Sequence, residues 1–173
     1  MMLEGVLLMT IAAAPLPTQE WVDLARYAGR WYEIARLPNR FQDQCAGDVV
    51  ASYALRPDGR VTVVNECQGR DGQRRRAEGV ARRADEKGPA SRLKVRFAPA
   101  VLSFLPFVWG DYWIVELDRD YRHAVVGDPS RKYLWILSRS PEMDAATYES
   151  LAAAARRLGF DTARLVPTPQ SAP

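Results

Sequence analysis

Polar and hydrophobic residues alternate along most of this chain, a period-two pattern that is typical of half-buried β-strands. The clearest example covers residues 91–97, where Leu93, Val95 and Phe97 share one face and the residues between them are cations. Side chains of a strand point alternately to its two faces. One face of this segment is therefore expected to contact a core, and the other to contact solvent.

Similar runs predict eight strands joined by short connections. Residues 51–55 and 60–65 flank the turn sequence 56–59, in which proline fixes one dihedral angle and glycine allows a positive φ, so they predict a hairpin. The remaining predicted strands are 31–36, 73–83, 91–97, 112–117, 121–126 and 132–139. The expected fold is all-β, and the economical topology is an eight-stranded up-and-down antiparallel β-barrel.

One C-terminal α-helix is expected after the last strand. Ser140 and Pro141 would supply its cap and its first-turn proline, and Gly159 would end it. The apolar residues between these points recur at helical spacing: Tyr148, Leu151, Ala152, Ala155 and Leu158. The preceding strand is apolar on both faces, so we expect the helix to cover it from outside the barrel.

Three short motifs resemble the signature sequences of the lipocalins. They are Gly29-x-Trp31 in the first strand, the segment 118–121 before the seventh strand, and the segment 134–139 that ends in Arg139. The resemblance covers about residues 23–167 and is closest to bacterial lipocalins and apolipoprotein D. It implies a small barrel that carries an apolar ligand.

The three motifs are expected to meet at one end of the barrel, because alternate connections of a meander lie at the same end. The ring of Trp31 can then pack against the guanidinium of Arg139, an interaction worth roughly 0.5–2 kcal/mol. We interpret a set of five residues as the structural closed end, as the resemblance also implies: Gly29, Trp31, Asp120, Tyr121 and Arg139.

The opposite end is expected to open into a cavity. Ala77, Gly79 and Ala81 share one face of the fourth predicted strand, and an eight-stranded barrel is wide enough for one small ligand. The parity of the strands gives the candidate ligand-binding residues as Phe41, Tyr53, Val63, Val95, Phe97, Trp109, Trp113, Val115, Tyr133 and Trp135. For any one of them core packing is the better explanation, but the whole set, together with the small residues of the fourth strand, indicates an apolar site.

The connection 99–109 at this end is unusually apolar. It is expected either to fold back over the core or to serve as a ligand portal, a peripheral membrane contact or a homodimer contact. The sequence leaves these alternatives open.

Cys45 and Cys67 are the only two cysteines. One disulfide is the expected state in an exported chain, and free thiols are the alternative. The bond would close a loop of about 22 residues and stabilise the fold by roughly 3 kcal/mol. The hairpin register places Cys67 opposite Val49, so the pairing requires a bend near Gly47.

The 173 residues, 47% hydrophobic and 26% charged, predict one domain over residues 19–167. Residues 1–18 combine a short apolar run with small residues and are expected to be a leader, which favours export to the periplasm or the outer membrane. No cysteine follows the apolar run, so a lipid anchor there is not expected. Residues 168–173 are expected to be a disordered tail.

The charge pattern does not suggest a nucleic-acid partner. The net charge is +3, and the arginines are scattered among the strands without stacking aromatic residues between them. The run Arg74–Arg76 is interpreted as a solvated strand face, with attraction to anionic lipid headgroups as the alternative.

The sequence also gives no sign of enzymatic chemistry. His123 is the single histidine, and neither a phosphate-binding glycine loop nor a paired Cys-x-x-Cys motif is present, so no metal site and no cofactor are expected. We expect a carrier of fatty acids, lysophospholipids or similar lipids. The alternatives are a tetrapyrrole or other pigment carrier and a lipid-modifying, isomerase-like enzyme.

Overall fold

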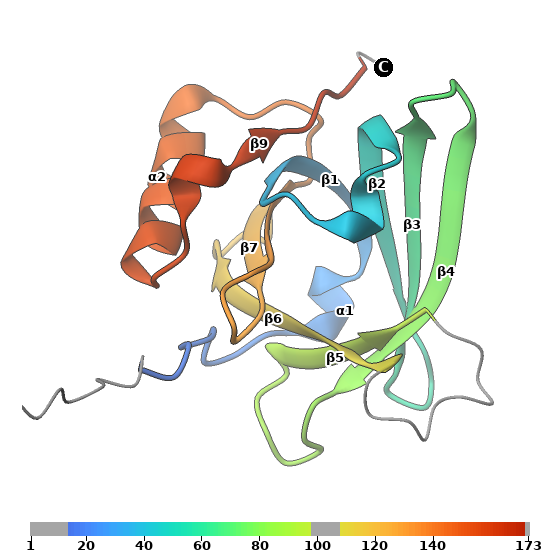
Figure 1. Ribbon diagram of the computed structural model, residues 1–173. Coiled ribbons are helices and arrows are strands. Elements are labelled where there is room, and N and C mark those ends of the chain that lie inside the picture. Colours follow the sequence, from blue (N-terminus) through green and yellow to red (C-terminus); the bar gives the residue numbers. More distant parts are fainter. Residues whose placement is uncertain (1–13, 98–107, 172–173) are drawn as a thin grey trace, which may run out of the picture.

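Eight antiparallel strands follow one another around a barrel in their order along the chain (Figure 1). The computed structural model describes residues 14–97 and 108–171. The strands are β1 (Gly29–Arg36), β2 (Cys45–Leu55), β3 (Val61–Gly69), β4 (Arg74–Arg83), β5 (Arg92–Arg96), β6 (Gly110–Leu117), β7 (His123–Gly127) and β8 (Leu134–Ser138). Strand β1 pairs with both β8 and β2 and so closes the barrel. The expected eight-stranded up-and-down barrel is confirmed.

Four short elements carried no periodic signal in the sequence. They are α1 (Leu24–Tyr27), η1 (Arg40–Gln42), η4 (Thr162–Arg164) and β9 (Val166–Pro167). Strand β9 pairs with the end of β1 and lies between that strand and the C-terminal helix (Figure 1). Elements of two to four residues are too short to show a repeat of either two or 3.6 residues.

The helix α2 (Ala145–Arg157) packs outside the barrel, as predicted from the apolar last strand. Its start was predicted wrongly. Asp144 is the cap, since its carboxylate accepts hydrogen bonds from the backbone N–H and the hydroxyl of Thr147. The predicted cap, Ser140-Pro141, lies in the connection before the helix. Gly159 follows the helix with φ of +91°, the conformation expected of a C-terminal glycine.

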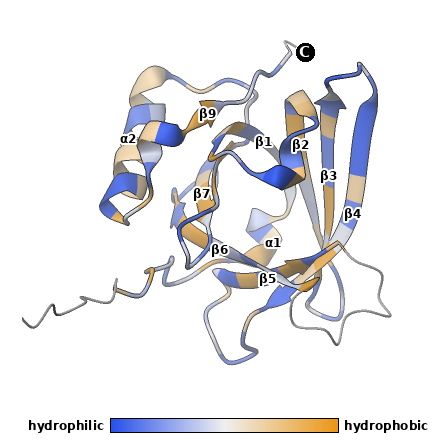
Figure 2. Cartoon of the chain, in the orientation of Figure 1, coloured by the Kyte–Doolittle hydropathy of each residue, from blue (hydrophilic) through white to orange (hydrophobic). Residues whose placement is uncertain are grey.

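Two hydrophobic cores share the barrel wall. The inner core lies within the barrel and includes Tyr27, Trp31 and Ile114. The outer core lies between the wall and α2 and includes Leu134, Ile136 and Ala155. Colouring by hydropathy shows hydrophobic stretches along β7 and hydrophilic ones along much of β4 (Figure 2). Strands that separate the two cores are buried on both faces, so they lose the simple alternation of half-buried strands.

The ends of the described chain pack on the barrel. Leu16 is 1% exposed and belongs to the outer core, while Thr168 is 6% exposed and hydrogen-bonded to Glu33. Over residues 14–18 and 168–171 the structure therefore differs from the expected leader, which was to lie outside the fold, and from the expected disordered tail. Both segments bury side chains that neither composition nor periodicity singled out.

Among the described residues, no helix combines the length and the apolar character needed to cross a bilayer.

Candidate functional site

Arg139 joins several backbone segments at one end of the barrel. Its guanidinium carbon lies 4.0 Å from the ring centroid of Trp31, which is fully buried. Its N–H groups donate to four backbone carbonyls, those of Arg26, Tyr27, Arg30 and Tyr121. The indole N–H of Trp31 donates to the Tyr27 carbonyl at 2.8 Å. These contacts fix α1 across this end of the barrel, which we call the floor.

The connection from β6 to β7 belongs to the same end. The Asp118 carboxylate accepts the backbone N–H groups of Arg122 and His123, each at 2.6 Å. Burial alone would raise the pKa of Asp118, but these hydrogen bonds lower it overall. Tyr121 has φ of +57° and stands in this turn, so β7 begins at His123 and not at residue 121 as predicted. Asp120 is exposed and lies 3.6 Å from Arg122.

Gly29 allows the close approach of Arg139. Its φ is +99°, and a Cβ at this position would lie 3.1 Å from Nη1 of Arg139. A larger residue would therefore be strained and would crowd the guanidinium.

A cavity of about 1090 Å³ extends from Tyr53 and Tyr112, near the floor, to the connections at the other end of the barrel, which we call the mouth. The predicted site residues that line it are Phe41, Tyr53, Val63, Val95, Phe97, Trp109, Tyr133 and Trp135. The small residues Ala77 and Ala81 also line it, as the composition of the fourth strand suggested. Most of the predicted connection 99–109 lies outside the described residues.

Trp113 and Val115 do not line the cavity, contrary to the prediction. They contact the outer core, and the inward positions of β6 are Tyr112 and Ile114. The strand is apolar on both faces because one faces the cavity and the other faces the outer core. Alternation therefore could not identify the inner face, and the parity chosen for this strand was wrong.

Three tyrosines form a polar cluster above the floor. The hydroxyl of Tyr112 lies 2.8 Å from that of Tyr27 and 2.8 Å from that of Tyr53. Tyr53 and Tyr112 line the cavity. Burial raises the pKa of Tyr53 to about 12, and it raises the pKa values of Tyr27 and Tyr112 well above their usual value. All three hydroxyls therefore stay protonated at neutral pH.

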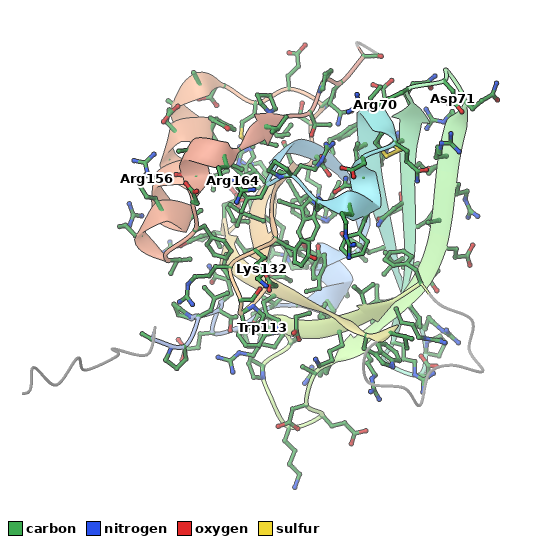
Figure 3. The ribbon with its side chains drawn as sticks, viewed as in Figure 1. Arg70, Asp71, Trp113, Lys132, Arg156 and Arg164 are labelled. Atoms are coloured by element: carbon green, nitrogen blue, oxygen red, sulfur yellow. A yellow bond between two sulfur atoms is a disulfide. The ribbon has the colours of Figure 1, made fainter. Side chains whose placement is uncertain are left out.

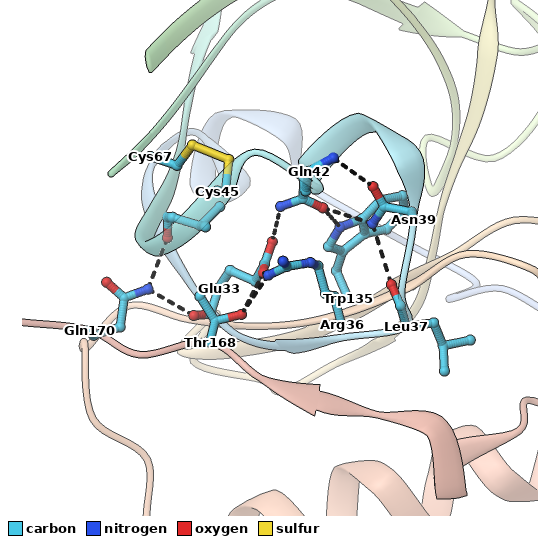
Figure 4. A network of polar contacts seen from close by, with 11 residues as sticks. Glu33, Arg36, Leu37, Asn39, Gln42, Cys45, Cys67, Trp135, Thr168 and Gln170 are labelled. Atoms are coloured by element: carbon cyan, nitrogen blue, oxygen red, sulfur yellow. Dashed lines mark hydrogen bonds and ion pairs between the residues drawn. A yellow bond between two sulfur atoms is a disulfide. The ribbon is translucent and has the colours of Figure 1, made fainter. Parts of the chain in front are cut away.

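A second polar network fixes the mouth (Figure 4). The indole N–H of Trp135 donates to the Gln42 side chain at 2.8 Å, and the Gln42 amide donates to Glu33 at 2.6 Å. Glu33 is 3% exposed and also accepts hydrogen bonds from Arg36 and Thr168. The C-terminal segment thus helps to orient an aromatic residue of the cavity wall. Sequence reasoning missed Glu33, Gln42 and Thr168 because residues far apart in the chain form this network.

Arg75 brings positive charge to the mouth. It pairs with Cys67 across β3 and β4, and both residues line the cavity, so their side chains share the inner face. The guanidinium forms an ion pair of 2.6 Å with Asp71, which lies beside Arg70 at the tip of the β3–β4 connection (Figure 3). The run of arginines is therefore not wholly a solvated outer face, as the alternation had indicated.

Comparisons with known proteins agree with this geometry. The Lipocalin-like domain family matches residues 22–170. Temperature-induced lipocalin-1 of Arabidopsis thaliana is 47% identical over 151 residues, which cover 87% of this chain and 80% of that protein. The chain belongs to the lipocalin family. The outer membrane lipoprotein Blc of Escherichia coli K12 is 39% identical to this lipocalin over 144 residues, 83% of this chain and 77% of that protein.

A solved structure of another protein shows the same fold. Insecticyanin from the tobacco hornworm Manduca sexta matches with a TM-score of 0.70 and 20% identity, covering 92% of this lipocalin and 87% of that chain. At this identity the likeness concerns the fold alone. The family recognised from the three motifs is confirmed by the sequence relatives.

The predicted disulfide of this lipocalin is present. An uninterrupted hairpin register would place Cys45 opposite Asp71. One register shift on each side of Gly47 instead brings Cys45 opposite Gly69. The Cα atoms of Cys45 and Cys67 thereby lie 5.7 Å apart, and the sulfur atoms are bonded. The bend that the pairing required near Gly47 is supplied by these bulges.

His123 lies in β7 beside the floor, and its backbone N–H and carbonyl pair with Asp118. In the part of this lipocalin that the structure describes, no cluster of three or more His, Cys, Asp or Glu side chains has the arrangement of a metal site.

Proposed function

We propose that this lipocalin binds small hydrophobic ligands, in particular fatty acids or lysophospholipids, and transports or stores them in the barrel cavity. The observation that carries the proposal is the composition of the cavity along its length. Its wall includes Val63, Leu93, Val95 and Leu137, and Arg75 stands at the mouth. An apolar cavity with a few polar groups is typical of sites for small ligands.

An amphiphile fits a cavity with an aliphatic wall and an arginine at its mouth better than a uniformly apolar molecule does. Its acyl chain would lie along the aliphatic wall, while a carboxylate or phosphate would lie near Arg75 at the mouth. The ion pair with Asp71 uses Nη2 of Arg75, and its buried Nε–H has no hydrogen-bond partner among the described residues, so the guanidinium can still donate to either anion. The strongest such hydrogen bonds are those in which both groups are charged.

Binding, and not catalysis, is the proposed activity. The two cysteines are joined in a disulfide and so offer no thiolate nucleophile in this state. His123 lies beside the floor, whereas Cys45 and Cys67 lie at the mouth end of the barrel. The chain thus offers no cysteine–histidine pair within reach of one substrate atom.

Export is the proposed destination. The disulfide is the state expected of a protein in an oxidising compartment, and the Blc relative is an outer membrane lipoprotein. We propose a periplasmic or outer-membrane-associated protein.

The decisive experiment is a titration of the purified protein with a fluorescent fatty acid, followed by displacement with palmitic acid and with a lysophospholipid. We expect saturable binding at one site per chain and complete displacement by at least one competitor. An Ala81→Trp variant, which places a large ring against the cavity wall, should lose at least ten-fold in affinity while keeping the circular dichroism of a β-barrel. Absence of saturable binding by both lipid classes would contradict the proposal.

A further inference from the structure

The tyrosine cluster is an unusual feature of an otherwise apolar region. Tyr53 and Tyr112 line the cavity, whereas Tyr27 belongs to the inner core and does not line it. Neighbouring side chains of the inner core include the aliphatic residues Val63 and Leu137. A pair of phenylalanines would fill the same space without any polar atom to satisfy. The hydroxyls therefore require an explanation beyond packing.

The hydrogen-bond inventory of the cluster is incomplete. Each of the three hydroxyls carries one proton, and the two bonds between them use two of the three. One proton remains without an acceptor among the described residues. If Tyr27 is a donor, the remaining proton lies on Tyr112 or Tyr53, the two tyrosines that line the cavity. In this arrangement the unpaired donor belongs to a cavity-lining residue, and a ligand oxygen that accepts its proton would favour this arrangement over the one in which Tyr112 donates to Tyr27.

The cluster is held in place by the floor. The backbone carbonyl of Tyr27 accepts hydrogen bonds from the side chains of Trp31 and Arg139. The ring centroids of Tyr27 and Trp31 lie 5.0 Å apart. Tyr27 also stacks on Tyr53 at 5.6 Å, and Tyr53 meets Tyr112 edge-on at 5.9 Å. Residues that close the barrel thus also position the three hydroxyls, which favours a pre-formed site.

We propose that these tyrosines form a subsite for a polar group on the buried end of the ligand. The inference rests on the proposed lipid-binding function and narrows the ligand class to acyl chains that carry a hydroxyl or ketone oxygen at the end distant from the headgroup. Such an oxygen accepts the remaining tyrosine proton. Because the hydroxyls stay protonated, the subsite keeps its donor at neutral and mildly alkaline pH.

The test compares two ligands that differ only at the buried end, palmitic acid and ω-hydroxypalmitic acid. In a cavity without a polar partner, the buried hydroxyl would weaken binding by roughly 5- to 150-fold. We expect the wild-type protein to bind the hydroxylated acid at least as tightly as palmitic acid. The double variant Tyr53→Phe/Tyr112→Phe should bind palmitic acid nearly normally and the hydroxylated acid about ten-fold more weakly or worse.

The ratio of the two dissociation constants is the measured quantity, since a partial loss of folded protein affects both ligands equally. Tyr148→Phe is the matched control, because Tyr148 lies on α2 against the outer core and does not line the cavity, so its ratio should equal that of the wild type. The subsite would be overturned if the wild-type protein bound palmitic acid at least ten-fold more tightly than ω-hydroxypalmitic acid. It would also be overturned if the double variant showed the same ratio of dissociation constants as the wild type. Failure to bind palmitic acid at all would instead contradict the lipid-binding function itself.

Discussion

Arg139 stabilises the floor through several interactions at once. One guanidinium stacks on Trp31 and donates to carbonyls from α1, β1 and the connection before β7. A single residue therefore ties α1 and the start of β1 to a connection that is far from both in the sequence. None of these contacts involves a cavity-lining atom of the mouth, so the role of Arg139 is to maintain the barrel.

Replacing Arg139 with alanine is expected to lower the free energy of unfolding by about 2–3 kcal/mol, from the lost cation–π contact and the lost charged hydrogen bonds. The affinity for palmitic acid should change less than three-fold, because the mouth and the aliphatic wall are untouched. Thermal or urea melts and fatty-acid titrations measure the two effects.

Arg122→Ala is the control for Arg139→Ala. Arg122 lies at the same end but is largely exposed, and its ion pairs with Asp118 and Asp120 are 3.6 Å long. Exposed pairs of this kind contribute little, so stability should fall by less than about 0.5 kcal/mol. A larger effect on affinity than on stability in Arg139→Ala would contradict the assignment of this residue to the floor.

Asp118 gives the floor turn a dependence on pH. Its pKa is lower in the folded protein than in the unfolded chain, so its charge stabilises the fold above about pH 4 and that contribution is lost as the pH falls through the folded-state pKa. Asp118→Asn should cost about 0.5–1 kcal/mol at pH 7, after allowance for solvent screening. In urea melts at pH values from about 7 to below 4, the difference in unfolding free energy between wild type and variant should shrink below about pH 4. A difference that is constant with pH would contradict this assignment.

At the scale of elements, the β2–β3 hairpin shows how local irregularity decides a covalent bond. The turn at 56–59 was predictable from proline and glycine, and the cysteine pairing required a bend near Gly47. The two bulges that supply this bend were not predictable, since no residue pattern specifies a bulge by itself. The disulfide was therefore predictable as a pairing of the only two cysteines, while its geometry depended on the tertiary structure.

Removing this bond with Cys45→Ser/Cys67→Ser is expected to lower stability by about 3 kcal/mol, since the bond closes a loop between residues 22 apart. The fatty-acid affinity measured below the melting temperature should remain within about five-fold of the wild-type value. Loss of a turnover activity in this variant, with binding intact, would instead indicate a thiol-dependent enzyme. Reducing agent added to the wild-type protein should lower its melting temperature in the same way.

Helix α2 was predictable as an element because Tyr148, Leu151 and Ala155 recur at helical spacing. Its place outside β8 was predictable because that strand is apolar on both faces. The N-terminal cap of the helix was not predictable, since both Ser140-Pro141 and Asp144 have suitable chemistry. The choice between them depends on where the chain leaves β8.

At the scale of the whole molecule, the closed and open ends of the barrel have separate tasks. The floor joins the motif residues and positions the tyrosines, whereas the mouth combines Arg75, the disulfide and the network of Glu33 and Trp135. One cavity connects the two ends. A ligand can therefore be recognised by its headgroup at one end and by its terminal group at the other.

The sequence alone determined the strand order, the barrel, the outer helix, the family and eight of the residues that line the cavity. These features depend on periodicity and on motifs, which are local properties of the chain. The tertiary structure decided which face of β6 points inward, where the bulges fall, how the terminal segments pack, and that Tyr27, Tyr53 and Tyr112 share hydrogen bonds. The physical reason is that a wall buried on both faces has no polar side to mark its orientation, and a hydrogen bond between distant residues leaves no trace in their local sequence.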